Sequence, residues 1–138
     1  MGYTIKEVAD KTNLSTYTIR YYEKEGLLPK VSRNELGNRV FSEDDLEWIS
    51  VICCLKNTGM HIKDIKIYID LKREGDSTLE VRRDIVTEHK KAVENKILQL
   101  KKELEKVNEK VEYYDIACED GTEELVRKKC KLKMMSFK

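Results

Sequence analysis

The sequence predicts a mainly α-helical protein: a winged helix-turn-helix head with a small β-hairpin wing, followed by a long coiled-coil helix for dimerisation. Three observations predict this class. Helix N-cap signals recur along the chain, a turn-rich segment separates two strand-like runs, and apolar residues recur every seven positions from Leu79 to Tyr114. We expect the head to span residues 1–75, the long helix residues 76–117, and a short tail residues 118–138.

Composition limits the class of protein further. The 138 residues include no run of 18 apolar residues that could cross a membrane, and the first residues lack the apolar core of a signal peptide. We therefore expect a cytoplasmic protein without a membrane partner. Charged residues make up 38% of the chain and aromatic residues 7%, which is typical of helical proteins with long solvated faces rather than of a large enzyme core. The formal net charge is only +1, so any basic surface for nucleic acid must be local.

The first two helices are predicted from their caps. Thr4-Ile-Lys-Glu7 fits a capping box, in which the threonine and glutamate side chains satisfy each other's orphan amide groups, so a helix should start there. Ser15 is a good N-cap for a second helix over residues 16–25, and Gly26 is the residue type that ends a helix in a left-handed conformation. Two short helices joined by so tight a turn form a helix-turn-helix, whose second helix enters DNA.

One face of this second helix carries hydroxyl, aromatic and cationic groups, whereas Ile19 and Tyr22 point the other way. A DNA major groove admits one helix, presents hydrogen-bonding base edges and is walled by phosphates, so such a face suits it. An ordinary solvated amphipathic helix would show the same pattern, and the helix alone does not decide between the two interpretations. The candidate DNA-contacting residues on this face are Thr16, Tyr17, Arg20, Tyr21 and Lys24.

A β-hairpin is expected next. The turn-rich segment Asn34–Asn38 lies between Lys30–Arg33 and Arg39–Phe41, two short runs with strand-like residues. A hairpin beside the second helix could place Arg33 and Arg39 along the phosphate backbone, where they would contribute affinity that is independent of sequence and sensitive to salt. The alternative is a solvated turn whose arginines contact nothing.

Several blocks of the head resemble a known family. They are Ile5–Ala9, Leu14–Ser15, Thr18–Glu23, Gly26–Pro29 and Gly37–Arg39. In this order they are similar to the DNA-binding head of the MerR family of transcriptional regulators. The resemblance implies a DNA-binding regulator and gives the phosphate role to Arg39. The sequence departs from the family pattern at Val40 and Phe41, where a second arginine and a tyrosine are common.

Two more short helices are expected before the long one. Ser42–Asp45 is a second capping box, opening a helix that stops near Gly59, and another helix begins after His61. The resemblance implies that this helix pair is a second wing whose first turn touches phosphate, and amide groups at a helix N-terminus attract anions. His61 is either a plain cap or a phosphate contact, and Lys63 is the better candidate for an ionic contact.

The longest helix is expected to open at a third capping box, Ser77–Glu80. No glycine or proline lies between Gly75 and Gly121. A helix of about 40 residues is about 60 Å long, and a head of this size cannot bury its apolar stripe. The chain has no second long helix, so we expect a homodimer through the seam residues Val93, Ile97, Leu100, Leu104, Val107, Val111 and Tyr114. The flanking charges do not decide between a parallel and an antiparallel pair; the resemblance implies an antiparallel one.

The effector is expected to be small or thiol-reactive. Residues 117–122 should break the long helix, and the resemblance places effector sensing beyond that point, where too little chain remains to enclose a drug-sized pocket. The candidate sensing residues are Cys54, Cys118 and Cys130. The segment around Cys54 is similar to a subgroup that responds to reactive aldehydes or thiol stress, although ordinary packing is the competing interpretation. The cysteines lack metal-ligand spacing, so no metal and no cofactor are expected.

Three classes of function can be compared. The first is a homodimeric regulator that binds an inverted repeat in promoter DNA and distorts it, so that RNA polymerase is affected indirectly through the DNA. The second is a structural or chromosome-anchoring protein with the same head. The third, an enzyme, has no support, because the chain has no glycine-rich phosphate loop and no nucleophile with a recognisable base.

Overall fold

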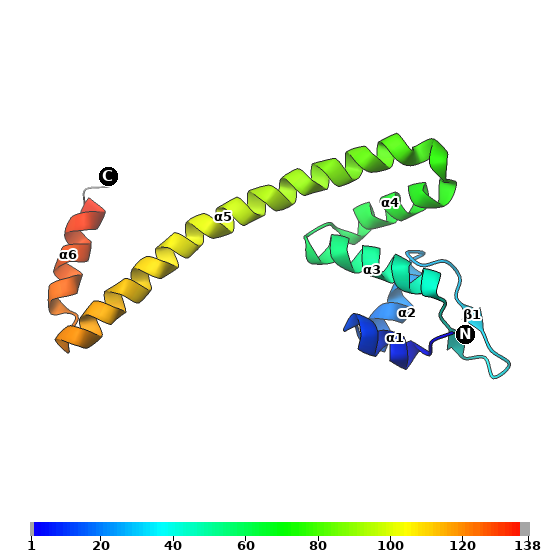
Figure 1. The fold of residues 1–138 in the computed structure, drawn as a ribbon, viewed down its shortest axis with the longest axis horizontal. Coiled ribbons are helices and arrows are strands. Elements are labelled where there is room, and N and C mark those ends of the chain that lie inside the picture. The colour runs from blue at the N-terminus through cyan, green and yellow to red at the C-terminus, as the bar shows by residue number, and fades with distance from the viewer. Residues whose placement is uncertain (1, 136–138) are drawn as a thin grey trace. The chain divides into compact units, whose positions relative to one another are not determined.

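The computed structural model describes residues 2–135 and the side chains of residues 2–130 (Figure 1). The predicted fold class is confirmed: a helical head with a two-stranded hairpin is followed by one long helix. The elements are α1 Ile5–Thr12, α2 Thr16–Lys24, β1 Ser32–Arg33, β2 Arg39–Val40, α3 Glu43–Asn57, α4 Ile62–Glu74, the 3-10 turn η1 Asp76–Thr78, α5 Leu79–Asp120 and α6 Glu124–Met135. The chain forms two compact units, residues 1–93 and residues 94–138.

Two of the three predicted capping boxes are present. The Glu7 amide donates to Thr4 Oγ1 at 3.1 Å, and the Thr4 amide donates to Glu7 Oε1 at 3.0 Å. In α3 the Asp45 amide donates to Ser42 Oγ at 3.1 Å, and the Ser42 amide donates to Asp45 Oδ2 at 2.9 Å. These local bonds satisfy amides that the first helical turn leaves without partners, and so they define where each helix begins.

The helix-turn-helix is closed by the turn between α1 and α2. Asn13 adopts a left-handed conformation with φ 57°, and Ser15 then caps α2 by accepting the Thr18 amide at 3.0 Å. Val8 from α1 and Ile19 from α2 are fully buried. The tight turn therefore packs the two helices against each other and leaves the opposite face of α2 open to solvent.

The hairpin pairs β1 with β2 in antiparallel register, with Ser32 opposite Val40 and Arg33 opposite Arg39. Asn34 Oδ1 accepts the amides of two residues in the turn, Leu36 and Asn38, each at 3.0 Å, and Gly37 has φ +82°. A side-chain amide that bonds its own turn and a glycine with positive φ are what a tight connection requires.

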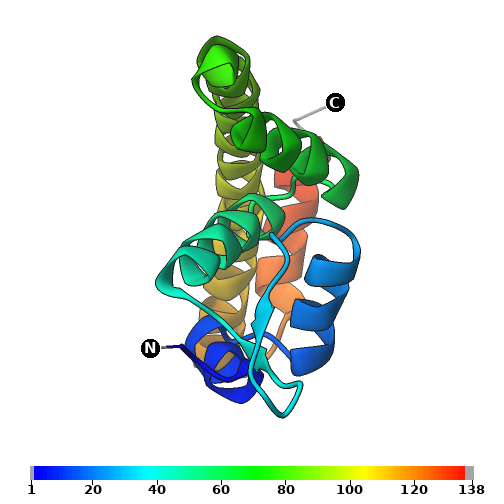
Figure 2. The same ribbon diagram turned by 90° about the vertical axis from the view of Figure 1, so that its right-hand side faces the viewer.

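The head's core lies around α3, which is placed between the α1–α2 pair and α4 (Figures 1 and 2). Ile49 and Ile52 of α3 and Ile65 and Ile69 of α4 are fully buried. Trp48 packs beside this core, with Lys72 Nζ 4.8 Å from the centroid of its ring. The head thus has a rigid hydrophobic centre that can hold its surface elements in fixed positions.

The predicted third capping box is wrong. Residues Asp76–Thr78 form a 3-10 turn, so Ser77 is not an N-cap. Thr78 is the buried link instead: its hydroxyl donates to the carbonyl oxygen of Leu71 at 2.7 Å and accepts from Arg82 Nε at 2.9 Å. The long-range bond to α4 is better satisfied by this tighter turn than by a local box.

The long helix ends later than the predicted break. It continues to Asp120 and stops before Gly121, which has φ +74°. Ala117 remains helical and is buried, as is Val126, because α6 folds back beside the end of α5 (Figure 1). Tyr113 on α5 also donates to Glu123 Oε1 at 3.0 Å.

Candidate nucleic-acid interface

The structure exposes the polar face of α2 as the sequence predicts. The exposed fraction of Tyr17 is 75%, and Arg20, Tyr21 and Lys24 are also exposed, while Thr16 is half-buried at the start of the helix. Ile19 and Tyr22 on the other face are fully buried. The candidate residues therefore lie together on one solvated surface, with a buried side that holds the helix in place.

A carboxylate joins this helix to the hairpin. Arg39 Nε donates to Glu23 Oε1 at 2.7 Å, and the Val31 amide donates to Glu23 Oε2 at 3.1 Å. The Arg39 and Glu23 side chains are only 22% and 18% exposed. Burial raises the pKa of the Glu23 carboxyl, but the hydrogen bonds from Arg39 and the Val31 amide, with the charges of Arg39 and Arg33, outweigh burial and leave that pKa below its ordinary value.

Sequence analysis missed this role of Glu23. The available signal was its position one helical turn after Ile19, which puts a carboxylate beside the buried face of α2, where it needs a partner. Arg39 itself is placed beside α2, as predicted, but part of its hydrogen-bonding capacity is used within the protein. Its other guanidinium nitrogens have no hydrogen-bond partner among the residues that the structure describes.

Arg33 and the start of α4 supply further cations. Arg33 is exposed on the hairpin, where its Nη1 donates to the Gly37 carbonyl oxygen at 2.7 Å. His61 is the N-cap of α4 without a side-chain cap bond, and it is exposed, as is Lys63. Of the nine predicted DNA-contacting residues, Thr16 and Arg39 are half-buried and the other seven are exposed.

The long helix presents an uncovered apolar seam. The most exposed of its large residues is Leu100, at 68%, and Ile97, Leu104, Val107, Val111 and Tyr114 are each about half exposed or more. Val93 is half-buried. Six large apolar side chains repeating on one side of a helix do not remain in water without a cost in free energy.

Comparison with protein families agrees with this geometry. The family described as MerR HTH family regulatory protein matches residues 3–72, and the family described as MerR, DNA binding, matches residues 46–109. The chain belongs to the MerR family. It is a DNA-binding transcriptional regulator and not an enzyme.

Relatives of this MerR chain support the assignment over most of its length. It is 44% identical over 117 residues to an uncharacterised HTH-type transcriptional regulator of Haemophilus influenzae, covering 85% of this chain and 87% of that one. It is 40% identical over 86 residues to the HTH-type transcriptional regulator AdhR of Bacillus subtilis, covering 62% of this chain and 61% of that one. Its structure is similar to the crystal structure of HiNmlR, a MerR family regulator lacking the sensor domain, bound to promoter DNA. The two sequences are 43% identical, the TM-score is 0.85, and the match covers 91% of this chain and 96% of that one.

The cysteines of this MerR chain lie in different environments. Cys54 and Cys118 are exposed, whereas Cys53 and Cys130 are half-buried. Burial raises the pKa of the Cys53 thiol, an effect that the nearby charge of Lys56 only partly offsets. Among the residues that the structure describes, no three His, Cys, Asp or Glu side chains gather as a metal site would require. Nor does any described helix have the length and apolar character needed to cross a membrane.

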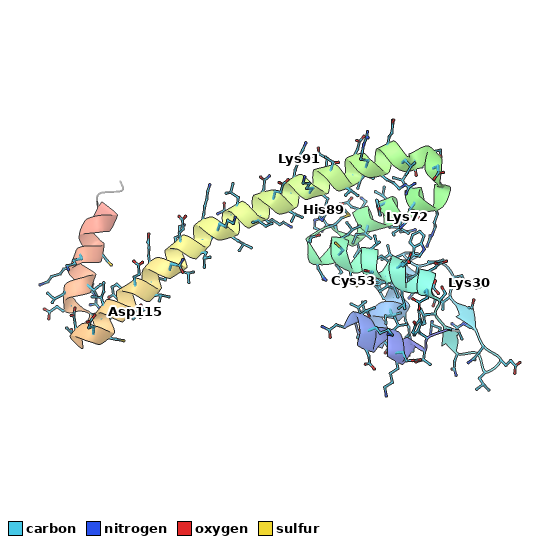
Figure 3. All side chains as sticks on the ribbon, in the orientation of Figure 1. Lys30, Cys53, Lys72, His89, Lys91 and Asp115 are labelled. Carbon is cyan, nitrogen blue, oxygen red and sulfur yellow. The ribbon has the colours of Figure 1, made fainter. Side chains whose placement is uncertain are left out.

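An open groove of about 580 Å³ lies between α4 and the first turns of α5. Its apolar lining includes Met60, Ile67, Val81 and Ile85. At one end His89 of α5 faces the end of α3, where its Nε2 lies 2.6 Å from Thr58 Oγ1 (Figure 3). Since Thr58 Oγ1 also donates to the Cys54 carbonyl oxygen at 2.7 Å, the segment carrying Cys54 is linked to α5.

Proposed function

We propose that this MerR regulator acts as a homodimer that binds an inverted repeat in promoter DNA and distorts it, thereby changing access of RNA polymerase to the promoter. In this proposal residues 1–75 bind DNA, residues 76–117 join the two copies, and residues 118–138 form a short tail. The observation that carries the proposal is the uncovered seam of α5 on a chain whose head exposes a polar and cationic face.

The seam argues for a second copy of the chain. Fully burying one Val, Leu or Ile side chain contributes about 1.5–3 kcal/mol, and the seam residues of this long helix would leave water together in a coiled coil. Apolar residues at alternating spacings of three and four form a coiled-coil seam, so the partner that fits α5 best is the α5 helix of a second copy. The same pairing would hold two heads at a fixed separation.

The head supplies two kinds of contact to each half-site. The face of Tyr17, Arg20, Tyr21 and Lys24 is suited to the major groove, and the cations of the hairpin and α4 are suited to phosphates. The promoter DNA bound by the similar HiNmlR supports promoter DNA as the ligand. Bending or twisting the site costs several kcal/mol, which two heads contacting one DNA face can offset.

We further propose that a small thiol-reactive effector acts at Cys54. This cysteine is exposed, and the hydrogen bonds through Thr58 connect its segment with His89 on α5. Cys118 is exposed too, but Cys118 and Cys130 lie near the end of the chain, away from the DNA-binding elements in sequence. Modification of Cys54 would therefore change the packing between α3 of the head and α5, the dimerisation helix.

The proposal is tested by transcription in vitro. A supercoiled template carrying the promoter selected by this protein, with purified RNA polymerase, should give a changed transcript level when the wild-type protein is added. Arg20→Ala serves as a matched control, because it should fold normally and lose specific binding. Binding by the wild-type protein with no change in transcript level would contradict the regulatory proposal and favour a chromosome-anchoring role.

A further inference from the structure

The structure assigns Lys6 to the DNA interface as well: we propose that the hollow between the start of α1 and the hairpin holds a phosphate of the DNA backbone, with Lys6 as one of its ligands. This inference rests on the proposed function, since it adds a phosphate contact to the same DNA-bound state. The sequence alone did not predict a DNA contact from α1.

The hollow is formed by three elements. It has a volume of about 300 Å³, and its lining includes Thr4 and Lys6 from the start of α1, Arg20 from α2, and Asn38 and Arg39 from the hairpin. Because a water molecule occupies about 30 Å³, a phosphate group fits with several waters. The hollow opens beside Arg20, so it lies next to the face proposed to enter the major groove.

The walls of the hollow are held together by the backbone. The Tyr3 amide donates to the Phe41 carbonyl oxygen at 2.8 Å, and the Phe41 amide donates to the Tyr3 carbonyl oxygen at 2.9 Å. Gly2 lies so close to the hairpin that a side chain there would collide with Val40. The Tyr3 hydroxyl also donates to Glu43 at the start of α3. The start of α1 therefore keeps a fixed position relative to the hairpin before any ligand arrives.

The charge of the hollow has one sign. Lys6, Arg20, Arg33 and Arg39 line it, and no carboxylate does so within the described part of the chain. Three carboxylates that bond residues of the lining are engaged within the protein: Glu7 in the cap of α1, Glu23 with Arg39, and Glu43 with the Tyr3 hydroxyl. Neither Lys6 nor Arg20 makes a hydrogen bond or ion pair with any side chain that the structure describes. Unpaired cations around a rigid hollow attract an anion, and the phosphodiester group of bound DNA is the anion that this surface would meet.

The test compares DNA affinity across salt concentrations. Duplexes selected from a random pool by the full-length protein, and a scrambled duplex, are titrated by fluorescence anisotropy from 50 to 200 mM KCl. Lys6→Ala should weaken binding to both duplexes by the same factor, because a phosphate contact carries no sequence information. Because the bound dimer loses two phosphate contacts, the salt slope should also fall by about 1.8, so that the ratio of mutant to wild-type Kd falls about 12-fold over this range.

Two control variants isolate the hollow from general charge. Lys6→Arg keeps the cation and should restore the slope, whereas Lys102→Ala removes an exposed cation of α5, outside the hollow, and should leave the slope unchanged. Circular dichroism checks that each variant folds. An unchanged slope for Lys6→Ala, or an equal change for Lys102→Ala, would overturn the assignment. In either case, DNA binding by the wild-type protein would leave the proposed function intact.

A second arm distinguishes DNA phosphate from a free anion. Inorganic phosphate is added to the DNA-free protein at constant ionic strength, and amide shifts of the hollow are followed by NMR. Weak binding that needs Lys6, together with the changed DNA slope, supports a site for DNA phosphate. Tight binding of inorganic phosphate with an unchanged DNA slope would make the hollow a small-anion site and overturn the proposal.

Discussion

Replacing both Leu100 and Leu104 by aspartate should convert the proposed homodimer to a monomer. These side chains are 68% and 55% exposed in the single chain, and each is present twice in a dimer. With about 1.5–3 kcal/mol for complete burial of a leucine, scaled by those exposed fractions, the four side chains contribute about 4–7 kcal/mol to association. That loss weakens association by about 10³ to 10⁵-fold, before the cost of placing carboxylates in the seam is added.

Sedimentation velocity at micromolar protein concentration measures this effect directly. The matched control is Lys102→Asp, which changes the net charge by the same amount on the outer side of the same helix, where Lys102 is exposed. Wild type and control should sediment as dimers, and the double variant as a monomer that retains its helical circular dichroism. A double variant that remains dimeric would refute the seam as the site of association.

The other predictions concern the head. Arg39→Ala should weaken binding to cognate and to scrambled DNA by nearly equal factors and should flatten the dependence of affinity on salt in anisotropy titrations. Unchanged affinity for scrambled DNA would show that Arg39 of the hairpin does not contact phosphate. The pKa of Glu23 is lowered in the fold, so its stabilising contribution is complete above the ordinary carboxyl pKa and is lost as pH falls through the lowered one. The difference in melting temperature between wild type and Glu23→Gln should therefore be present at pH 7 and shrink in acid, and a difference that grows in acid would contradict the pairing with Arg39. Since burial raises the pKa of Cys53 while Cys54 is exposed, a maleimide should label Cys54 before Cys53 at pH 7, as measured by mass spectrometry of peptides; faster labelling of Cys53 would contradict the structure.

Sequence reasoning succeeded where the deciding interactions are local. The boxes at Thr4 and Ser42 each involve side chains three residues apart, so residue type and spacing nearly determine them. The seven-residue repeat is likewise a local pattern, and it predicted which side of the long helix would be apolar. The exposed face of α2 followed from helical periodicity for the same reason.

Prediction from sequence failed where residues distant in the chain form hydrogen bonds that replace local ones. The segment at Ser77 has the composition of a capping box, but the bond from Thr78 to Leu71 on α4 favours a 3-10 turn. The pairing of Glu23 with Arg39 spans 16 positions, and the bond between Thr58 and His89 spans 31. No spacing rule identifies such pairs, because they depend on how packed helices bring their surfaces together.

Hydroxyl-radical footprinting of the selected promoter duplex tests most directly whether two heads, joined through α5, bind one DNA together. Two heads that bind together should protect two segments on one face of the duplex, related by twofold symmetry, with centres about 34 Å or a whole multiple of it apart, appearing at the same protein concentration. The monomeric Leu100→Asp and Leu104→Asp double variant should lose both segments together. A single protected segment for the wild-type protein, or two segments that fill independently, would contradict joint binding by two heads.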